Sequence, residues 1–485
     1  MKYGRVMIAA PRSGSGKTII TCGLLAWLKD RSYNVRAYKC GPDYIDPMFH
    51  RQVIGVPGGN LDTFFSDYDS IRRQVAGSDS DAAVIEGVMG IYDGIAGASG
   101  TGSCYDVAKA TGTPVILVMD VKGMGPTMIP VIKGILTDDT GCLIRGIVLN
   151  RISERYFGEI RPLIDAALSE ISERRGVTAE LLGGLPNLKD IRLESRHLGL
   201  MMPDEIDDLT DQVTAARNLI AENIDTDRLL EIMQEADDLS SEDYPETPAL
   251  TEENQAASAQ KGKSVTIVTA RDEAFCFYYE ENLRMLEEYG INIAEFSPLY
   301  DRKLPEEADG ILLGGGYPEL YAEDLSDNVS MRESIRNAVS GGMPVLAECG
   351  GFMYLLDEMA DTEGKMHPMC GVIPGESINT GKLGRFGYIT VSENTDPESD
   401  GTDRASETLL SGLTVRGHEF HYYDSDNNGS DALAVKPGSG RSWECMHAGP
   451  AMLAGYPHLY YPSCPELIVR FRQKMEEYSQ NRPED

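Results

Sequence analysis

Residues 6–28 read VMIAAPRSGSGKTIITCGLLAWL, and this stretch decides the fold of the first half of the chain. The apolar run 6–10 predicts a buried strand, and the apolar residues after Thr18 recur at the spacing of one helix face. A Gly/Ser turn and Lys17 lie between them. Strand, glycine loop and helix in this order are the context that a phosphate-binding loop requires. A plain turn followed by an accidental lysine is the alternative interpretation.

The loop offers the groups that bind a nucleotide. Small residues at Ser13, Gly14 and Gly16 let backbone N–H groups converge on phosphate oxygens, and the helix N-terminus adds positive partial charge. Lys17 is expected to neutralise the terminal phosphates, and the Thr18 hydroxyl to ligate Mg²⁺. The loop departs from G-x-x-x-x-G-K-[ST] only at its first glycine, which is Pro11 here. The sequence therefore predicts a nucleotide site.

Composition limits the class of protein. The chain has 485 residues, enough for two or three domains, with 41% hydrophobic and 25% charged residues as in ordinary globular proteins. A net charge of −33 argues against nucleic acid or an anionic membrane as a partner. Nine scattered cysteines without a C-x-x-C pair suggest neither a zinc site nor a disulfide framework. Because we find neither a signal peptide nor a membrane-spanning run, we expect a cytoplasmic protein.

Buried strands recur through the first half. Further apolar runs alternate with helical segments and lie at 35–40, 82–87, 114–120, 145–150 and 181–186. This alternation predicts a parallel, doubly wound α/β sheet.

Carboxylates follow these strands, at the sheet edge where ligands bind. Asp43 and Asp46 lie in a loop after the second strand, and suit Mg²⁺ or a substrate group unless they only form an Asx turn. Glu86 ends the third strand, where a phosphate-loop protein holds its second Mg²⁺ ligand. Asp93 follows in a Gly-flanked turn, where either a structural role or a role toward substrate is open.

An acidic segment separates the two halves. Residues 235–260 contain eight acidic and no basic side chains, a composition that buries too little apolar surface to order itself. We predict domains at 1–234 and 263–485 joined by a linker at 235–262. In the second half we expect strands at 264–270, 291–296 and 310–316, a helix at 275–289, and surface loops at 393–407 and 424–442.

A cysteine after a strand is the main chemical signal of the second half. Residues 344–351 read PVLAECGG, which has the pattern of a nucleophile elbow with Cys349 at the turn. The following helix N-terminus should lower the pKa of the thiol and favour thiolate. The glycine run at 314–316 and the N–H group of Gly350 are suited to an oxyanion hole. Five histidines are candidate bases, His367, His418, His421, His447 and His458, and a buried structural cysteine is the alternative.

The ordered set of motifs resembles the cobyrinate a,c-diamide synthase family over nearly the whole chain. The motifs are SGSGKT (13–18), KCGPDYIDPMFH (39–50), NLDTFF (60–65), VIEGVMGIYDG (84–94), RHLGL (196–200), DEAFCFYYEENL (272–283), LGGGYPEL (313–320), AECGGFMYL (347–355), GHEFHYY (417–423) and AGYPHLYY (454–461). The resemblance implies an N-terminal P-loop domain like dethiobiotin synthetase and a C-terminal class I glutamine amidotransferase domain. It implies a ligase that uses ATP, Mg²⁺ and glutamine to amidate a tetrapyrrole such as cobyrinate in cobalamin biosynthesis.

The resemblance also assigns roles. It makes Cys349 the nucleophile and His458 its base, with the oxyanion held by N–H groups of Gly315, Gly316 and Gly350. It matches Lys17, Thr18 and Glu86 to positions for ATP and Mg²⁺, and Asp43, Tyr44, Asp46 and Asp93 to positions for the substrate carboxylate and acyl phosphate.

One feature departs from other class I amidotransferases. Those enzymes have glutamate two residues after the histidine, whereas this chain has Tyr460. A Cys–His dyad is implied, and Glu419 is one candidate for orienting His458.

Two alternative functions stay open. Nickel-sirohydrochlorin, in the coenzyme F430 pathway, is an alternative substrate, because a related family shares much of this motif set. A P-loop regulatory or partitioning ATPase is the alternative of another class, but it leaves the cysteine elbow unexplained. For the enzyme we expect a monomer or homodimer.

Overall fold

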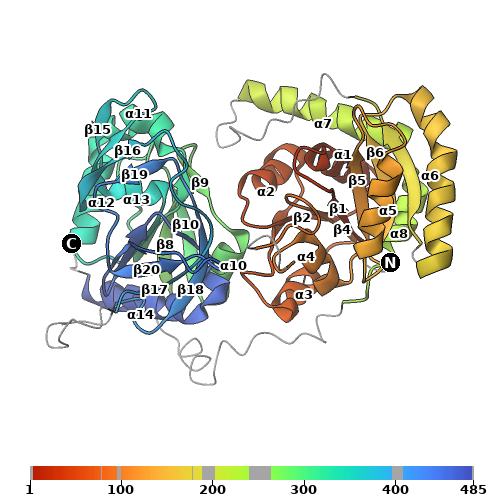
Figure 1. The fold of residues 1–485 in the computed structure, drawn as a ribbon. Helices are drawn as coiled ribbons and strands as arrows, with labels where there is room; N and C mark the ends of the chain where they lie inside the picture. The colour runs from red at the N-terminus through yellow and green to blue at the C-terminus, as the bar shows by residue number, and fades with distance from the viewer. Residues whose placement is uncertain are drawn as a thin grey trace. The chain divides into compact units, whose positions relative to one another are not determined.

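The computed structural model describes residues 4–77, 79–95, 100–176, 178–187, 203–239, 264–395 and 408–482. The chain forms two compact units, residues 1–246 and 247–485, drawn in red to yellow and in green to blue in Figure 1. Most of the predicted linker, and all of the RHLGL motif, lie outside the described residues. The predicted domain limits therefore stay a prediction.

The first unit is built on one parallel sheet with the strand order β3-β2-β4-β1-β5-β6-β7. Its strands are β1 Gly4–Ala9, β2 Val35–Cys40, β3 Gly58–Leu61, β4 Ala82–Glu86, β5 Val115–Asp120, β6 Ile144–Asn150 and β7 Glu180–Leu185. Its helices are α1 Lys17–Asp30, α2 Ile45–Phe49, α3 Tyr68–Ala76, α4 Cys104–Thr111, α5 Met128–Asp138, α6 Glu154–Arg175, α7 Pro203–Asn223 and α8 Thr226–Met233, with a π-helical turn η1 at His50–Ile54. The predicted doubly wound fold is confirmed.

Alternate residues of each strand face different helices, which buries both faces of the sheet. On β1, Met7 and Ala9 belong to the core shared with α3, α4, α5 and α6. Val6 and Ile8 belong to the other core, beneath α1, α7 and α8. Strands such as β4 and β5 therefore read as nearly continuous apolar runs. By contrast, β3 has the sequence GGNL, which contains one large apolar residue and gave no strand signal.

The second unit has a mainly parallel six-stranded sheet, with the order β10-β8-β11-β13-β23-β22. Its strands are β8 Val265–Ala270, β10 Ile291–Phe296, β11 Gly310–Leu313, β13 Val345–Glu348, β22 His447–Ala448 and β23 Met452–Gly455. The helices are α10 Glu280–Glu288, α11 Ala322–Asp327, α12 Val329–Ser340, α13 Gly350–Leu355 and α14 Pro465–Asn481, with 3-10 turns η3 Pro318–Tyr321 and η4 Tyr461–Ser463.

Antiparallel strands complete the second unit. They are β9 Phe275–Phe277 with β12 Gly315–Gly316; β14 Leu356–Ala360, β15 Met366–Pro368, β16 Ile373–Asn379 and β19 Tyr423–Ser425; and β17 Phe386–Glu393, β18 Thr414–Phe420, β20 Ala432–Val435, β21 Ser442–Cys445 and β24 His458–Leu459.

Two predictions for the second unit are wrong. The predicted helix 275–289 begins with strand β9, and α10 starts only at Glu280, because residues 275–277 pair with the glycines of β12. The predicted loop 424–442 contains β20, whose Ala432 and Ala434 are buried against β17. The predicted loop at 393–407 lies largely outside the described residues.

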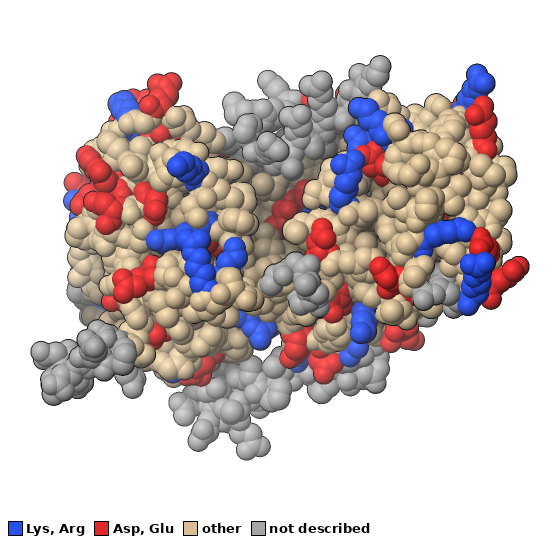
Figure 2. Space-filling view, in the orientation of Figure 1, with Lys and Arg blue, Asp and Glu red and all other residues tan. Residues whose placement is uncertain are grey.

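The surface mixes both signs of charge. In Figure 2, acidic and basic side chains are interspersed over the drawn face of each unit. Among the described residues, no helix combines the length and the apolar character that crossing a membrane requires.

Candidate functional site

The phosphate-binding loop lies between β1 and α1, and its glycines have the conformation that the turn requires. Gly14 and Gly16 have φ of 71° and 93°, in the left-handed region that favours glycine. A Cβ atom on Gly16 would lie 2.3 Å from Nδ2 of Asn150, which donates a hydrogen bond to the Ser15 carbonyl at 2.8 Å. Asn150, at the end of β6, therefore fixes the loop from two strands away in the sheet. Ser13 is exposed beside Gly14, on the open side of the loop.

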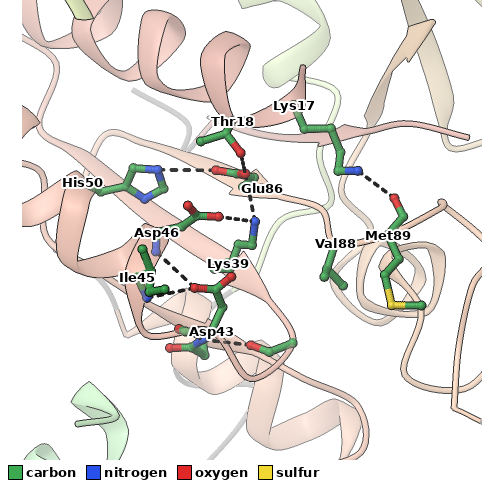
Figure 3. Close-up of polar contacts among 12 residues, drawn as sticks. Lys17, Thr18, Lys39, Asp43, Ile45, Asp46, His50, Glu86, Val88 and Met89 are labelled. Carbon is green, nitrogen blue, oxygen red and sulfur yellow. Dashed lines mark hydrogen bonds and ion pairs between the residues drawn. The ribbon is translucent and has the colours of Figure 1, made fainter. Parts of the chain in front are cut away.

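Lys17 and Thr18 are the first two residues of α1. The Lys17 ammonium donates to the carbonyl oxygen of Met89 at 2.7 Å, and burial lowers the pKa of this lysine. The Thr18 hydroxyl donates to Oε1 of Glu86 at 2.6 Å, as Figure 3 shows. The helix start and the end of β4 thus bring together the three residues predicted for phosphate and Mg²⁺.

Behind this loop lies a buried charge cluster, formed by Lys39, Asp46, His50 and Glu86 (Figure 3). The Lys39 ammonium contacts Oδ2 of Asp46 at 2.5 Å and Oε1 of Glu86 at 2.8 Å. Nε2 of His50 lies 3.5 Å from the other oxygen of Glu86. Strands β2 and β4 are adjacent and parallel, with Lys39 opposite Glu86, so the sheet register itself creates the central ion pair.

The two carboxylates of this cluster share one lysine, and their pKa values move apart. Burial opposes ionisation of Glu86, but Lys39 and His50 outweigh it and lower the pKa of this carboxyl. Burial and the neighbouring Glu86 raise the pKa of Asp46. Glu86 is therefore the stronger acid of the two.

Glu86 and Thr18 fit a Mg²⁺ site. The ionised carboxylate and the hydroxyl are adjacent, and both are oxygen ligands of the kind that this ion prefers. Oε2 of Glu86 is buried and makes no hydrogen bond among the described residues.

The other predicted substrate residues lie in the segments that follow β2 and β4. Oδ1 of Asp43 accepts hydrogen bonds from the N–H groups of Ile45 and Asp46 at 2.9 and 3.1 Å, which is the Asx turn given above as the alternative. Oδ2 of Asp93 accepts from the N–H group of Gly90 at 2.8 Å. Tyr44 precedes α2 and is largely buried. Each aspartate therefore has a local structural role, with one oxygen engaged by the backbone.

The second site is organised around Cys349, between β13 and α13. Its backbone, with φ 49° and ψ −105°, is in a strained conformation of the kind found at functional turns. A Cβ atom on Gly351 would lie 2.2 Å from the carbonyl oxygen of Leu313, so only glycine lets α13 pack this close to β11. The predicted elbow is present.

Sheet register brings Cys349 and His458 to the same edge. Glu348 pairs with Gly455 across β13 and β23, and the N–H group of Cys349 donates to the Gly455 carbonyl at 2.8 Å. His458 follows three residues later and is buried. A Cβ atom on Gly315 would lie 2.5 Å from Cε1 of this histidine.

The glycines predicted for the oxyanion hole lie beside this turn. A Cβ atom on Gly350 would be 3.3 Å from the nitrogen of Gly316. A Cβ atom on Gly316 would be 2.0 Å from the Ala274 carbonyl oxygen, because β12 packs directly on β9. Gly316 and Gly350, from two different segments, therefore lie close together beside Cys349.

The predicted lowering of the thiol pKa is wrong. Burial raises the pKa of Cys349, and the nearby carboxyl groups of Glu319, Glu419 and Glu348 act in the same direction. Burial also lowers the pKa of His458, with His418 and His421 adding to the effect. Because the thiol and the imidazole are both neutral, the reaction depends on removal of the thiol proton by the imidazole as a general base, and not on a preformed thiolate.

No sequence motif indicates a role for three residues of these sites, Lys39, His50 and Glu348. Glu348 ends the apolar strand β13 and Lys39 is the last residue but one of β2, and an ionisable residue near the end of a strand was a usable signal. His50 gave none, because its contact with Glu86 depends on the π-helical turn.

Comparison with known proteins agrees with this arrangement. Residues 6–200 match the family model of the CobQ/CobB/MinD/ParA nucleotide binding domain. Residues 266–463 match the CobB/CobQ-like glutamine amidotransferase domain.

Curated relatives match along nearly the full length. Proteins named cobyrinate a,c-diamide synthase are similar to this chain, from Caldanaerobacter subterraneus (36% identity, covering 96% of this chain and 97% of that protein) and Listeria innocua (35%, 96% and 98%). The protein of that name from Picrophilus torridus is 36% identical, covering 97% and 98%. The chain belongs to the cobyrinate a,c-diamide synthase family.

Proposed function

We propose that this chain catalyses the ATP- and glutamine-dependent amidation of the a and c acetate side chains of cobyrinate. The names of the relatives support this substrate over nickel-sirohydrochlorin. The two sites support the two half-reactions, one using ATP and one releasing ammonia from glutamine.

The first unit carries the activation step. A carboxylate does not react with ammonia, so the γ-phosphoryl group of ATP is transferred to a carboxylate oxygen of the substrate. Ammonia then attacks the carbonyl carbon of this acyl phosphate, and phosphate leaves. Lys17 and the N–H groups of residues 13–16 bind the phosphates. Thr18 and Glu86 would hold Mg²⁺, which supplies charge neutralisation to the phosphates when bound.

The substrate carboxylate is expected at the loop after β2. Asp43 and Tyr44 lie there, Asp46 follows in the first turn of α2, and Asp93 lies in the loop after β4. These residues orient the acetate side chain toward the γ-phosphate.

The second unit carries the glutaminase step. The sulfur of Cys349 bonds to the amide carbon of glutamine, while His458 takes the thiol proton and returns it to the departing ammonia. N–H groups at Gly315, Gly316 and Gly350 hold the oxyanion. Water then hydrolyses the glutamyl thioester.

The observation that carries the proposal is the strained backbone of Cys349 at the start of α13, with His458 at the same sheet edge. The test offers the purified protein ATP, Mg²⁺ and glutamine with cobyrinic acid or with nickel-sirohydrochlorin, and counts amides by mass spectrometry. Two amides on cobyrinic acid are expected. Two amides on the nickel compound alone would reassign the substrate.

A cysteine variant tests the glutaminase assignment. Cys349→Ser should lose amidation with glutamine and retain it with ammonium salts. Full activity of this variant with glutamine would contradict the assignment. ATP hydrolysis without any amide on either compound would favour a regulatory ATPase.

A further inference from the structure

The base of the glutaminase site needs a partner for its second ring nitrogen. An imidazole takes a proton efficiently only if its tautomer and orientation are fixed by a group at the other nitrogen. The residue two positions after His458 is Tyr460, so the partner must come from elsewhere in the fold.

Glu348 is placed to be that partner. It is the last residue of β13, directly before Cys349, and its side chain is buried. Oε2 of Glu348 lies 3.9 Å from Nδ1 of His458. Oε1 accepts a hydrogen bond from the Tyr461 hydroxyl at 3.0 Å, and the carboxyl group also accepts one from the backbone of Leu459, so both partners fix its position beside the imidazole.

The imidazole ring is also held from its face. His418 stacks on His458 with ring centroids 4.9 Å apart and planes at 16°. Nδ1 of His418 in turn makes a hydrogen bond of 2.9 Å with the Tyr279 hydroxyl. Stacking defines the plane of the His458 ring, and Glu348 lies at the ring edge that carries Nδ1.

Glu419 has different neighbours. Its Oε1 accepts a hydrogen bond from Nε1 of Trp443 at 3.2 Å, and its Oε2 lies 3.5 Å from Nε2 of His421. These neighbours of Glu419 do not include His458, whereas Glu348 does contact it. The contacts therefore favour Glu348 over Glu419 as the residue that orients His458.

We infer that Glu348 is the positioning residue of His458, an inference that rests on the proposed glutaminase step. Its carboxylate accepts the Nδ1 hydrogen, which leaves the Nε2 lone pair for the thiol proton of Cys349, and it balances the imidazolium that forms. Catalytic hydrogen bonds are often long before substrate binds, and the inference requires the 3.9 Å separation to shorten when glutamine binds.

The pH at which Glu348 ionises decides the conditions for a second test of the inference. Burial raises its pKa to about 8, so the carboxylate that accepts the Nδ1 hydrogen predominates at pH 9. The titratable groups that act on the pair are Cys349, His418, His421 and Tyr461.

The experiment compares three glutamate variants of the full chain. Glu348→Gln removes the proposed acceptor, Glu419→Gln removes the competing buried carboxyl, and Glu358→Gln is an exposed control on β14. Glutamate release at pH 9, with saturating ATP and cobyrinic acid, should fall about 10²-fold in kcat for Glu348→Gln, with KM for glutamine changed less than about twofold. Glu358→Gln should match the unsubstituted protein, and Glu419→Gln should lose less than Glu348→Gln.

The tautomer of His458 is measured by ¹⁵N NMR of histidine-labelled protein at pH 9, with the signal assigned by its loss in His458→Gln. We expect protonation at Nδ1 in the unsubstituted protein and a mixture in Glu348→Gln. Protonation at Nε2 in the unsubstituted protein overturns the inference even if Glu348→Gln does not fold. So does an unchanged kcat in Glu348→Gln. If the unsubstituted protein releases no glutamate, the proposed glutaminase function fails instead, and the tautomer still decides whether Glu348 orients the ring.

Discussion

At the scale of single residues, Lys39 holds two buried carboxylates together. Its ammonium contacts both Asp46 and Glu86, and all three side chains are almost completely buried. Lys39→Met leaves these carboxylates without a cation and should lower the free energy of unfolding of the first unit by about 3 kcal/mol. Each unit contains one tryptophan, Trp27 in the first and Trp443 in the second. The fluorescence of Trp27 therefore reports urea unfolding of the first unit in a Trp443→Phe background.

Two further variants control this prediction. Lys122→Met, at an exposed position, should change the free energy of unfolding little. Asp46→Asn combined with Lys39→Met should recover part of the loss, because one buried charge is removed. A stability of Lys39→Met equal to that of the unsubstituted protein would show that the ion pair is not needed.

Glu348 makes the stability of the second unit depend on pH. Its pKa is about 8 in the folded protein, against an ordinary value of 4.5. Between pH 4.5 and about pH 8, the Glu348 carboxyl keeps its proton in the folded protein but releases it in the unfolded chain. The free energy of unfolding therefore has its full value below pH 4.5 and falls as pH rises to about 8. From pH 5 to pH 8 the free energy of unfolding should fall by about 3 kcal/mol more than in Glu348→Gln. Urea unfolding followed by Trp443 in a Trp27→Phe background measures this difference, and parallel pH curves would contradict it.

At the scale of elements, the approach of α13 to β11 depends on a missing side chain. A Cβ atom on Gly351 would lie 2.2 Å from the Leu313 carbonyl, whereas one on Gly449 would meet nothing within 4 Å. Gly351→Ala should displace α13 and the Cys349 turn, reducing kcat for glutamine about 10²-fold, while Gly449→Ala stays close to the unsubstituted protein. Steady-state glutaminase assays on both variants test this, and equal kcat values would mean that the turn tolerates the shift.

The elements that sequence predicts well are those buried on both faces. Strands such as β4 and β5 read as apolar runs, because helices cover the sheet on each side. Strand β3, with sequence GGNL, is formed by pairing with β2 rather than by its own propensity. Strand β9 lay inside a predicted helix for the same reason, since its partner β12 is 38 residues or more away in sequence.

In the two sites, too, local sequence motifs identify some residues and miss those whose contacts come from distant segments. Local motifs identified Lys17, Thr18 and Cys349, because each lies at a turn whose sequence pattern is specific. The contacts of Glu348 with His458 and of His50 with Glu86 join segments distant in sequence. The rise in the thiol pKa of Cys349 follows from burial and three neighbouring carboxyls, which no local motif encodes.

At the scale of the whole molecule, the two units carry separate chemistry, so a variant of one site and a variant of the other should lose different activities. Lys17→Ala removes the buried ammonium at the start of α1 and should reduce ATP-dependent amidation about 10²-fold with either glutamine or ammonium salts. Cys349→Ser should lose only the reaction with glutamine. ADP, glutamate and amide are measured in parallel for both variants, with the exposed Lys122→Ala as the control.

Because the two sites lie in different units, the basal glutamate release of Lys17→Ala without ATP should match that of the unsubstituted protein. Loss of this release would mean that the phosphate-binding loop is needed for the glutaminase fold as well as for ATP.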